Sequence, residues 1–269
     1  MCRALKVSRS GYYAWRNRKA SQRAKENEKL IVFIEKVFLS SRKTYGSPRV
    51  FKQLRADGIA CGRNRVARLM RHENIVAQRQ RRYKRSRSLP HEANVTENIL
   101  KRQFTVSQPN KVWAGDISFF WTGSGWIHLA VIMDLFSRRI IGWSLSTNAN
   151  EELVKGALNM AIANRNMPDG ILHHTDRGSQ YGSDEYQKIL KERNMTCSMS
   201  RKGDCYDNAV VESFFKTIKV ELTRDRRFIS REEARTAIFE YIEIFYNRKR
   251  LHSTLGYLSP AEFESQNIT

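Results

Sequence analysis

The sequence predicts an α/β domain with a mixed β-sheet, preceded by a small, basic helical region. The first observation is a stretch from about residue 110 to 146 that is rich in aromatic and β-branched residues and is interrupted by turn signals. The second is the alternation of strand and helix patterns that follows it. The third is an uneven charge, because residues 1–104 hold 27 Lys and Arg against seven Asp and Glu and so carry +20 of the formal net charge of +21. A charge so concentrated suits a polyanion, and we expect nucleic acid as the partner.

Composition excludes several classes of protein. A chain of 269 residues that is 41% hydrophobic and 28% charged is expected to be soluble, with one large domain or two modest ones. The longest apolar run, LAVIMDLF, is too short to cross a bilayer, and no apolar signal-peptide core follows Met1, so we expect a cytoplasmic protein without a membrane partner. The four cysteines contain no CxxC pair, which favours reduced thiols over a disulfide framework or a zinc site.

Helical patterns dominate the first part of the chain. Ser8 is a candidate N-cap of a short helix, in a segment typical of the last helix of a helix-turn-helix. Apolar spacing predicts a helix over 28–41, and Ser47 as N-cap with Pro48 at the first helical position predicts another. A basic helix is expected within 62–75. Helix, short turn and basic helix are typical of a DNA-reading module, although a purely structural helical pair has the same pattern.

The second part of the chain predicts the sheet and its helices. Strands are expected in KVWAGDISFFWT and in GWIHLAVIMDLFSRRIIGWSLS, with Trp113 and Trp121 in the core. A helix is expected in NEELVKGALNMAIANR, then a strand in GILHHTDRGS, a helix in DEYQKILKERN, a strand in MTCSMS and a helix after KGDCYDN. From Ser230 the tail is expected to be helical as far as the loop-like NRKRLHSTLGYLSP.

Three acids stand where a globular core would not favour them. Asp116 lies in an almost wholly apolar strand, so it is exposed at an edge, paired, or bound to a cation, because an unpaired buried carboxylate is costly. Asp176 ends a strand before a Gly turn, where the sites of α/β sheets gather but ordinary turn acids also occur. Glu212 is expected one turn inside a helix, on the same face as Lys216 and Lys219, where a surface ion pair is an open alternative.

Other polar residues near these acids have structural explanations. Asp204 is expected in a turn and Asp207 at a helix cap. Asp134 is a fourth acid in a strand, for which a structural role is favoured over metal binding. His174 can contact DNA or water, but a hydrogen-bonded structural histidine is favoured.

The three acids together carry a resemblance to a known family. Fifty-nine residues separate Asp116 from Asp176, and thirty-five separate Asp176 from Glu212. That last spacing, with HTDRGSQY around the second acid and DNAVVESFFKTIKVE around the third, resembles the DDE core of retroviral-type integrases and bacterial insertion-sequence transposases. The closer resemblance is to transposases of two-reading-frame insertion sequences, and it is carried by CRALKVSRSGYYAW, TYGSPRV, RVARLM and YIEIFYNRKRLHSTLGYLSPAEF. These motifs cover nearly the whole chain in the same order.

The resemblance implies an RNase H-like fold, a mixed five-stranded sheet with flanking helices. The first acid would lie on the first strand, the second after the fourth strand and the third on a following helix. The three acids would bind two Mg²⁺ or Mn²⁺ ions, with Asp116 bridging both. The enzyme would be a DNA transposase that cleaves element ends and then joins the freed 3′-OH to target DNA by metal-dependent phosphoryl transfer. The expected segments are a partial helix-turn-helix segment (1–24), a basic helical DNA-binding region (25–88), a linker (89–108), an RNase H-like integrase catalytic core (109–228) and a C-terminal helical tail (229–269).

The expected partner is double-stranded DNA, both the terminal inverted repeats of an element and its target. Because two element ends must be brought together, we expect a homo-oligomer, a dimer or larger, associated with the bacterial nucleoid. The chain begins partway through what resembles a helix-turn-helix, so we expect either a fragment or a second-frame product with reduced activity alone. The product of the upstream frame is a further expected partner. The residues expected to contact DNA are Lys216, Lys219, Arg63, Arg65, Arg68, Arg81, Arg82, Lys84, Arg85, Arg248 and Arg250.

The sequence departs from the family pattern at two points. Gly115 precedes the first acid where the group often carries Thr, and the zinc-binding domain of retroviral integrases is absent, so no zinc is expected. Two alternative functions are a nuclease on the same fold, which would transfer only to water, and a non-catalytic DNA-binding regulator. The basic first region favours a protein that holds DNA ends, and the presence of all three acids and both lysines argues against a regulator.

Overall fold

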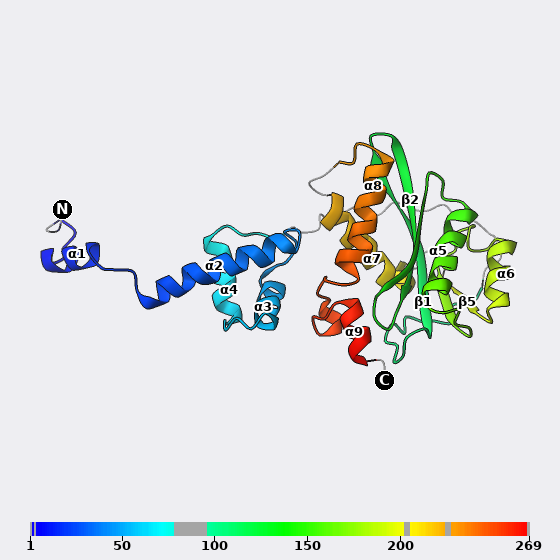
Figure 1. Ribbon diagram of the computed structural model, residues 1–269, viewed down its shortest axis with the longest axis horizontal. Helices are drawn as coiled ribbons and strands as arrows, with labels where there is room; N and C mark the ends of the chain where they lie inside the picture. Colours follow the sequence, from blue (N-terminus) through cyan, green and yellow to red (C-terminus); the bar gives the residue numbers. More distant parts are fainter. Residues whose placement is uncertain (1, 3, 78–95, 202–204, 224–226, 268–269) are drawn as a thin grey trace. The chain divides into compact units, whose positions relative to one another are not determined.

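The computed structural model describes residue 2 and residues 4–77, 96–201, 205–223 and 227–267. The chain divides into two compact units, Met1–Gln78 and Arg79–Thr269 (Figure 1). Each unit buries its own set of apolar side chains. The finer division into five segments stays a prediction.

The first unit is helical. Its helices in the described part are α1 (Arg9–Arg16), α2 (Gln22–Ser40), α3 (Ser47–Ala56) and α4 (Arg63–His72). Ser8 caps α1 as expected and accepts a hydrogen bond from the N–H of Gly11 at 3.0 Å. The start of α3 corrects the sequence-based expectation, because the extended residue Gly46 is the N-cap and Ser47 is already helical. The core is made by apolar residues of α2, α3 and α4, namely Leu30, Ile34, Val37, Val50, Leu54, Val66, Leu69 and Met70.

The second unit is built on a five-stranded mixed sheet with the order β3-β2-β1-β4-β5. The strands are β1 (Val112–Thr122), β2 (Gly125–Asp134), β3 (Ile140–Ser146), β4 (Leu172–Thr175) and β5 (Thr196–Met199). The first three strands are joined by short turns and pair in antiparallel fashion, whereas β4 pairs in parallel with both β1 and β5. The mixed five-stranded sheet expected from the sequence is confirmed.

Helices cover both faces of this sheet (Figure 1). On one face lie α5 (Glu151–Asn164) and α6 (Asp184–Glu192), and on the other lie α7 (Ala209–Thr223) and α8 (Arg231–Phe239). The helix α5 approaches β3 so closely that a Cβ atom on Gly142 would lie 2.2 Å from the carbonyl oxygen of Ala157. Only glycine therefore fits at this position of β3.

The two tryptophans of β1 have different environments. Trp113 is fully buried between the sheet and α5, as expected. Trp121 is 57% exposed, so the prediction that it lies in the core is wrong. It stands at the far end of β1, next to the turn into β2, beyond the part of the strand that contributes to the main apolar cluster.

The C-terminal tail packs against the sheet of its own unit. The helix α8 continues into a π-helical segment (Glu240–Tyr246), and the loop that follows leads to a last helix, α9 (Pro260–Asn267). The buried side-chain amide of Asn247 accepts a hydrogen bond from the N–H of Ile140 at 3.0 Å and donates one to its carbonyl oxygen at 2.9 Å. The expected loop-like segment is therefore fixed to the edge strand β3.

Two expectations concern the chain as a whole. Within the described residues, no helix is long and apolar enough to cross a membrane. Cys2, Cys61 and Cys197 are free thiols, and the side chain of Cys205 lies outside the described part.

Candidate active site

The three acids of the predicted site come from three elements that the fold brings together. Asp116 lies in the middle of β1, Asp176 follows the last residue of β4, and Glu212 is in the first turn of α7. The parallel register between β1 and β4 ends with Ala114 opposite His174, so Asp116 and Asp176 each follow two residues after the last paired position, and the charge of Asp176 acts on Asp116. Because neighbouring strands lie about 4.8 Å apart, the two carboxylates come close to each other where β4 ends beside β1.

The electrostatics of the site show that the three carboxylates interact. Burial raises the pKa of Asp116 well above its usual range, and the nearby charges of Asp176 and Glu212 raise it further. The N–H of Ile117, which donates to Asp116 Oδ1 at 2.8 Å, opposes this rise. Burial also raises the pKa of Asp176, and the charge of Glu212 raises it further. A hydrogen bond from the N–H of Gly178 at 3.0 Å lowers this pKa in part. Without a cation, this cluster is therefore a source of repulsion.

Two lysines of α7 lie beside the acids. Lys216 Nζ is 3.0 Å from Glu212 Oε2, one helical turn away, and its side chain is exposed. Lys219 is half-buried, and burial lowers its pKa while the charge of Asp116 raises it. Its ammonium lies 4.7 Å from the centre of the Phe119 ring. The spacing of these lysines after Glu212 predicted their common face, and the structure adds the contact of Lys219 with β1.

The segment before α7 positions the third acid. Asn208 Nδ2 donates a hydrogen bond of 3.1 Å to the carbonyl oxygen of Gly115, the residue before Asp116, and both groups are buried. Asn208 thereby ties the start of α7 directly to β1. No role was expected for Asn208 from the sequence, although a polar residue at a helix start next to an acid motif is a signal for such a buried hydrogen bond.

Asp207 anchors the same turn, and its placement corrects the expected helix cap. Its buried carboxylate accepts hydrogen bonds from the Arg102 Nε at 2.9 Å and from the backbone N–H and side chain of Arg201 at 3.0 to 3.3 Å. Burial alone would raise the pKa of Asp207, but these donors hold it well below its usual range. The carboxylate binds two arginines from neighbouring segments, which fixes the turn rather than α7 alone. Asp204 lies outside the described residues.

Two buried side chains next to Asp176 have different hydrogen-bonding states. His174 is buried, and its ring contacts the hydroxyls of Ser198 at 2.9 Å and Ser200 at 3.2 Å. Burial lowers the pKa of His174 to about 4, so the ring is neutral and structural. Tyr181 is also buried, but its hydroxyl has no hydrogen-bond partner among the described residues, and burial together with the charges of Asp176 and Asp116 raises its pKa.

Asp134 has the structural role that the sequence favoured. It is fully buried at the end of β2, and its two carboxylate oxygens accept hydrogen bonds from the N–H groups of Asn110 at 2.9 Å and Phe136 at 3.0 Å. Arg165 approaches it at 3.4 Å. These contacts close the turn between β2 and β3.

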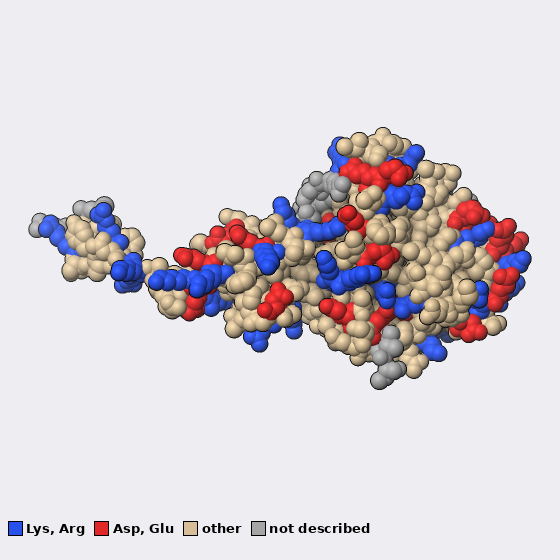
Figure 2. Space-filling model, viewed as in Figure 1, with Lys and Arg blue, Asp and Glu red and all other residues tan. Residues whose placement is uncertain are grey.

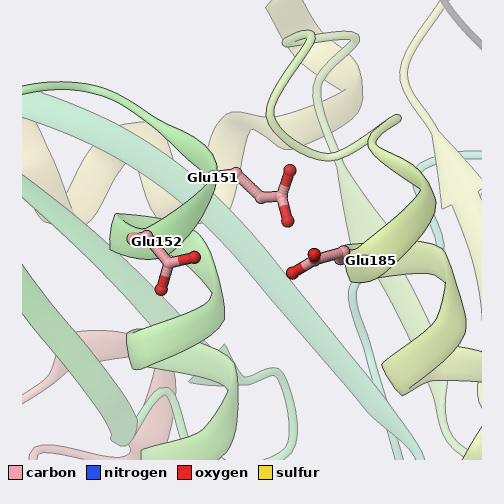
Figure 3. Close-up of side chains that lie close together, drawn as sticks. All are labelled: Glu151, Glu152 and Glu185. Carbon is pink, nitrogen blue, oxygen red and sulfur yellow. The ribbon is translucent and has the colours of Figure 1, made fainter.

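A second group of acids lies at the starts of α5 and α6 (Figure 3). Glu151, Glu152 and Glu185 form the one set of three His, Cys, Asp or Glu residues in the described chain whose ligand atoms all lie within 4.8 Å of one another. Lys155 forms ion pairs with all three, at 3.4 Å to Glu151 and 2.8 Å to Glu152, and hydrogen bonds to Glu185. The lysine offsets part of the negative charge of this group and links two helices at the surface.

The expected DNA contacts on α4 fall into two kinds. Arg63 and Arg68 are exposed. Arg65 is half-buried, and it donates a hydrogen bond to Asn27 at 2.8 Å and pairs with Glu26 at 3.4 Å within the first unit. Around α1 the charged side chains that are visible are Lys and Arg, whereas the visible face of the second unit carries both signs of charge (Figure 2). The expected contacts Arg81, Arg82, Lys84 and Arg85 lie outside the described residues.

The two arginines of the tail also differ. Arg248 is exposed. Arg250 is 4% exposed, and its guanidinium donates to both carboxylate oxygens of Glu221 at 2.7 to 3.1 Å. This geometry corrects the expectation that Arg250 binds DNA, because its donors already bind a buried carboxylate that belongs to α7.

Comparison with protein families assigns most of the chain. Two models described as "Integrase core domain" match residues 106–205 and 212–268. A model described as "HTH-like domain" matches residues 24–83. The two integrase-core matches include all three acids of the candidate site.

The chain also resembles known proteins and solved structures. The chain is 44% identical over 270 residues to the transposase InsF for insertion sequence IS3A of Escherichia coli (strain K12), which covers 100% of this chain and 94% of the relative. An intasome chain of simian T-cell lymphotropic virus, solved in complex with a PP2A regulatory subunit, shares 15% identity and covers 79% of this chain and 73% of its own, with a TM-score of 0.50. The HTLV-2 integrase catalytic core domain in complex with magnesium shares 18% identity and covers 58% of this chain and 96% of its own, with a TM-score of 0.43. From its sequence identity to an IS3 transposase along its entire length, the chain belongs to the IS3 family of insertion-sequence transposases, whose catalytic domain is an integrase core.

Proposed function

We propose that Asp116, Asp176 and Glu212 form the catalytic site of this transposase and bind two Mg²⁺ or Mn²⁺ ions. The reaction is cleavage at the ends of an insertion sequence, followed by joining of the freed 3′-OH to target DNA. The observation that supports the proposal is the parallel pairing of β1 with β4, which brings the strand that carries Asp116 beside the strand that Asp176 follows, with the charge of Glu212 raising the pKa of both.

The donor set fits hard divalent cations. Mg²⁺ and Mn²⁺ prefer carboxylate oxygens and retain some water ligands, so three acids from separate elements suffice. The buried hydroxyl of Tyr181 has no hydrogen-bond partner among the described residues, and the charges of Asp176 and Asp116 act on it. A water ligand of a bound cation would give this hydroxyl a partner. Bound there, the cations would activate the attacking oxygen and stabilise the leaving oxygen of the phosphodiester.

The side chains around the acids position the DNA and the site. Lys216 and Lys219 present two ammonium groups next to Glu212 and Asp116, where they can neutralise phosphates on either side of the reacting one. Asn208 holds the start of α7 against β1 and so sets the distance between the first and third acids. Because the carboxyl of Asp116 has a raised pKa, protons compete with cations there, and we expect metal affinity to fall as the pH is lowered.

The first unit supports binding of the DNA ends. Its fold is an HTH-like domain, and α4 exposes Arg63 and Arg68 on the side away from its core. Arg81, Arg82, Lys84 and Arg85 continue the basic segment along the sequence. We propose that these residues contact the phosphates of terminal inverted repeats and that at least two chains act together, since the reaction joins two ends.

A strand-transfer assay tests the site. A pre-cleaved element end, a target plasmid and Mg²⁺ are incubated with the unaltered protein, with Glu212→Gln, and with Glu152→Gln as a control acid in the Lys155 network. We expect Glu212→Gln to lose about 10³-fold or more in joining rate, because one metal ligand is lost, and Glu152→Gln to keep it. Joining by Glu212→Gln at the unaltered rate would show that the site lies elsewhere.

A further inference from the structure

Three aromatic rings are exposed side by side on the hairpin formed by β1 and β2. Phe119, Trp121 and Trp126 are 51%, 57% and 47% exposed. Trp121 stands opposite Trp126 in the antiparallel register, with ring centres 4.8 Å apart, and the centre of the Phe119 ring is 5.1 Å from that of Trp126. We call these three residues the hairpin aromatic patch. Exposed aromatic clusters of this kind mark binding surfaces.

The patch is continuous with the acid site around the open edge of β1. Among the described residues, β4 pairs with this edge of β1 over Val112–Ala114 and Phe228 forms a bridge with Thr122 at its far end, so the strand pairing leaves the edge uncovered between these two points. Asp116 and Phe119 point to opposite faces of β1, but Lys219 reaches both across this edge. Its ammonium lies 4.7 Å from the Phe119 ring centre and interacts with the charge of Asp116. Lys219 therefore lies close to both Asp116 of the acid site and Phe119 of the hairpin aromatic patch.

A second cation borders the other end of the patch. Arg231, the first residue of α8, donates a hydrogen bond of 3.4 Å from Nε to the carbonyl oxygen of Trp126. Rings flanked by cations match the chemistry of an unpaired DNA strand, because aromatic side chains stack bases of any sequence and cations neutralise the phosphates between them. A protein partner would have to supply acids for both cations, whereas every nucleotide brings its own charge.

We propose that the hairpin aromatic patch binds unpaired bases of the DNA strand that runs through the acid site. Phe119 and Trp121 are three and five residues beyond Asp116, which is roughly 10 and 17 Å along a strand. At about 3.4 Å per stacked nucleotide, the bases held there are roughly three to five nucleotides from the reacting phosphate. This inference rests on the proposed role of Asp116, Asp176 and Glu212.

The test compares two forms of one DNA end, binding to the full chain without divalent cations. One form is fully paired. The other, called the tailed end, carries five unpaired thymidines and is made in two versions, one with the tail on each strand. Fluorescence anisotropy of labelled DNA gives both affinities. Trp121→Ala and Trp126→Ala should bind a tailed end about tenfold more weakly and leave binding of the paired end unchanged. Trp121→Phe should keep most of the tailed affinity, because a ring remains for stacking.

The matched control is Phe239→Ala, which removes an exposed ring outside the patch and should change neither affinity. Equal weakening of tailed and paired ends by Trp121→Ala, or no change in either, would overturn the proposal. A change in oligomeric state on light scattering, with tail preference intact, would also overturn it and make the patch an interface between chains. The measurement uses no metal, so its failure is distinct from a failure of the Glu212→Gln strand-transfer test, which concerns the acid site alone.

Discussion

At the scale of single residues, the balance between repulsion and cation binding is the main property of the site. Asp116 is placed in a buried strand next to two other acids, and its compensating contacts are one backbone N–H and a half-buried lysine. Such an arrangement costs stability in the absence of a cation, and binding of a cation recovers it. The same placement therefore links folding stability, pH and metal in a measurable way.

Replacing Asp116 by Asn should stabilise the metal-free protein at neutral pH. Because the folded-state pKa of Asp116 is raised, its destabilising effect is absent below about pH 4, grows as the pH rises toward the raised pKa and is complete above it. Asn removes this effect, so the melting temperature should rise by about 2–4 °C for each kcal/mol of repulsion relieved, and the gain should vanish near pH 4. Differential scanning fluorimetry from pH 4 to 8 measures it.

The response of the melting temperature to Mg²⁺ provides the matching control. The unaltered protein should melt at a higher temperature with Mg²⁺, whereas Asp116→Asn should not respond. Asp169→Asn, a change of an exposed acid outside the site, should respond like the unaltered protein. A lower melting temperature for metal-free Asp116→Asn at pH 7 would contradict the repulsion described for this site.

At the scale of elements, the position of α7 is determined by contacts at both of its ends. Asn208 and Asp207 hold its start to β1 and to the segments that carry Arg102 and Arg201. Near its other end, the carboxylate of Glu221 accepts hydrogen bonds from Arg250 and from the hydroxyl of Tyr241. The tail therefore supports the helix that carries the third acid, and this is why part of the basic sequence near the C-terminus is buried.

Arg250 and Arg248 should behave differently when each is replaced by Ala. Removing Arg250 leaves the buried carboxylate of Glu221 without its ion-pair partner, which typically costs about 3–5 kcal/mol, whereas Arg248 is exposed and its loss should be nearly neutral for stability. Urea unfolding measures both. Replacing the pair together, by Arg250→Met with Glu221→Leu, should recover much of the loss. Equal stabilities of the two single variants would show that the pair does not hold the tail.

At the scale of the whole molecule, charge and catalysis are assigned to different parts of the chain. Residues 1–104 carry +20 of the +21 net charge, and the three proposed catalytic acids all lie in the second compact unit. The HTH-like domain ends near the boundary between the two units. We therefore expect DNA binding to depend mainly on the first unit and phosphoryl transfer on the second.

Deleting residues 1–88 should abolish tight binding of element ends while the second unit still folds. Because each phosphate contact contributes about −0.9 to the slope of log affinity against log salt for duplex DNA, the slope should become much shallower. Anisotropy titrations at several salt concentrations measure it, and cooperative thermal unfolding shows that the remaining unit is folded. Survival of both affinity and salt slope would place the DNA-holding residues in the second unit.

Those parts of the fold that depend on local sequence signals could be predicted from the sequence. Strand patterns, caps and turns are local, so the ranges and order of β1 to β5 and of α5 to α7 followed from the sequence. Errors arose where the environment of one side chain depends on distant packing. Trp121 has the pattern of a core residue but is exposed at the far end of β1, and Arg250 has the pattern of a surface cation but forms an ion pair with a buried glutamate 29 residues earlier.

The sequence by itself determined which chemistry this protein carries, since acid spacing, lysine spacing and the basic first region are properties of the chain's order. Only the tertiary structure decided how those residues meet. The pairing of β1 with β4 brings Asp116 and Asp176 close together, and the hydrogen bond from Asn208 to Gly115 brings the start of α7 to them. The position of α7 also places Lys219 next to the exposed ring of Phe119. The physical reason is that spacing along a chain limits which residues can meet, whereas strand pairing and buried hydrogen bonds select which of them do.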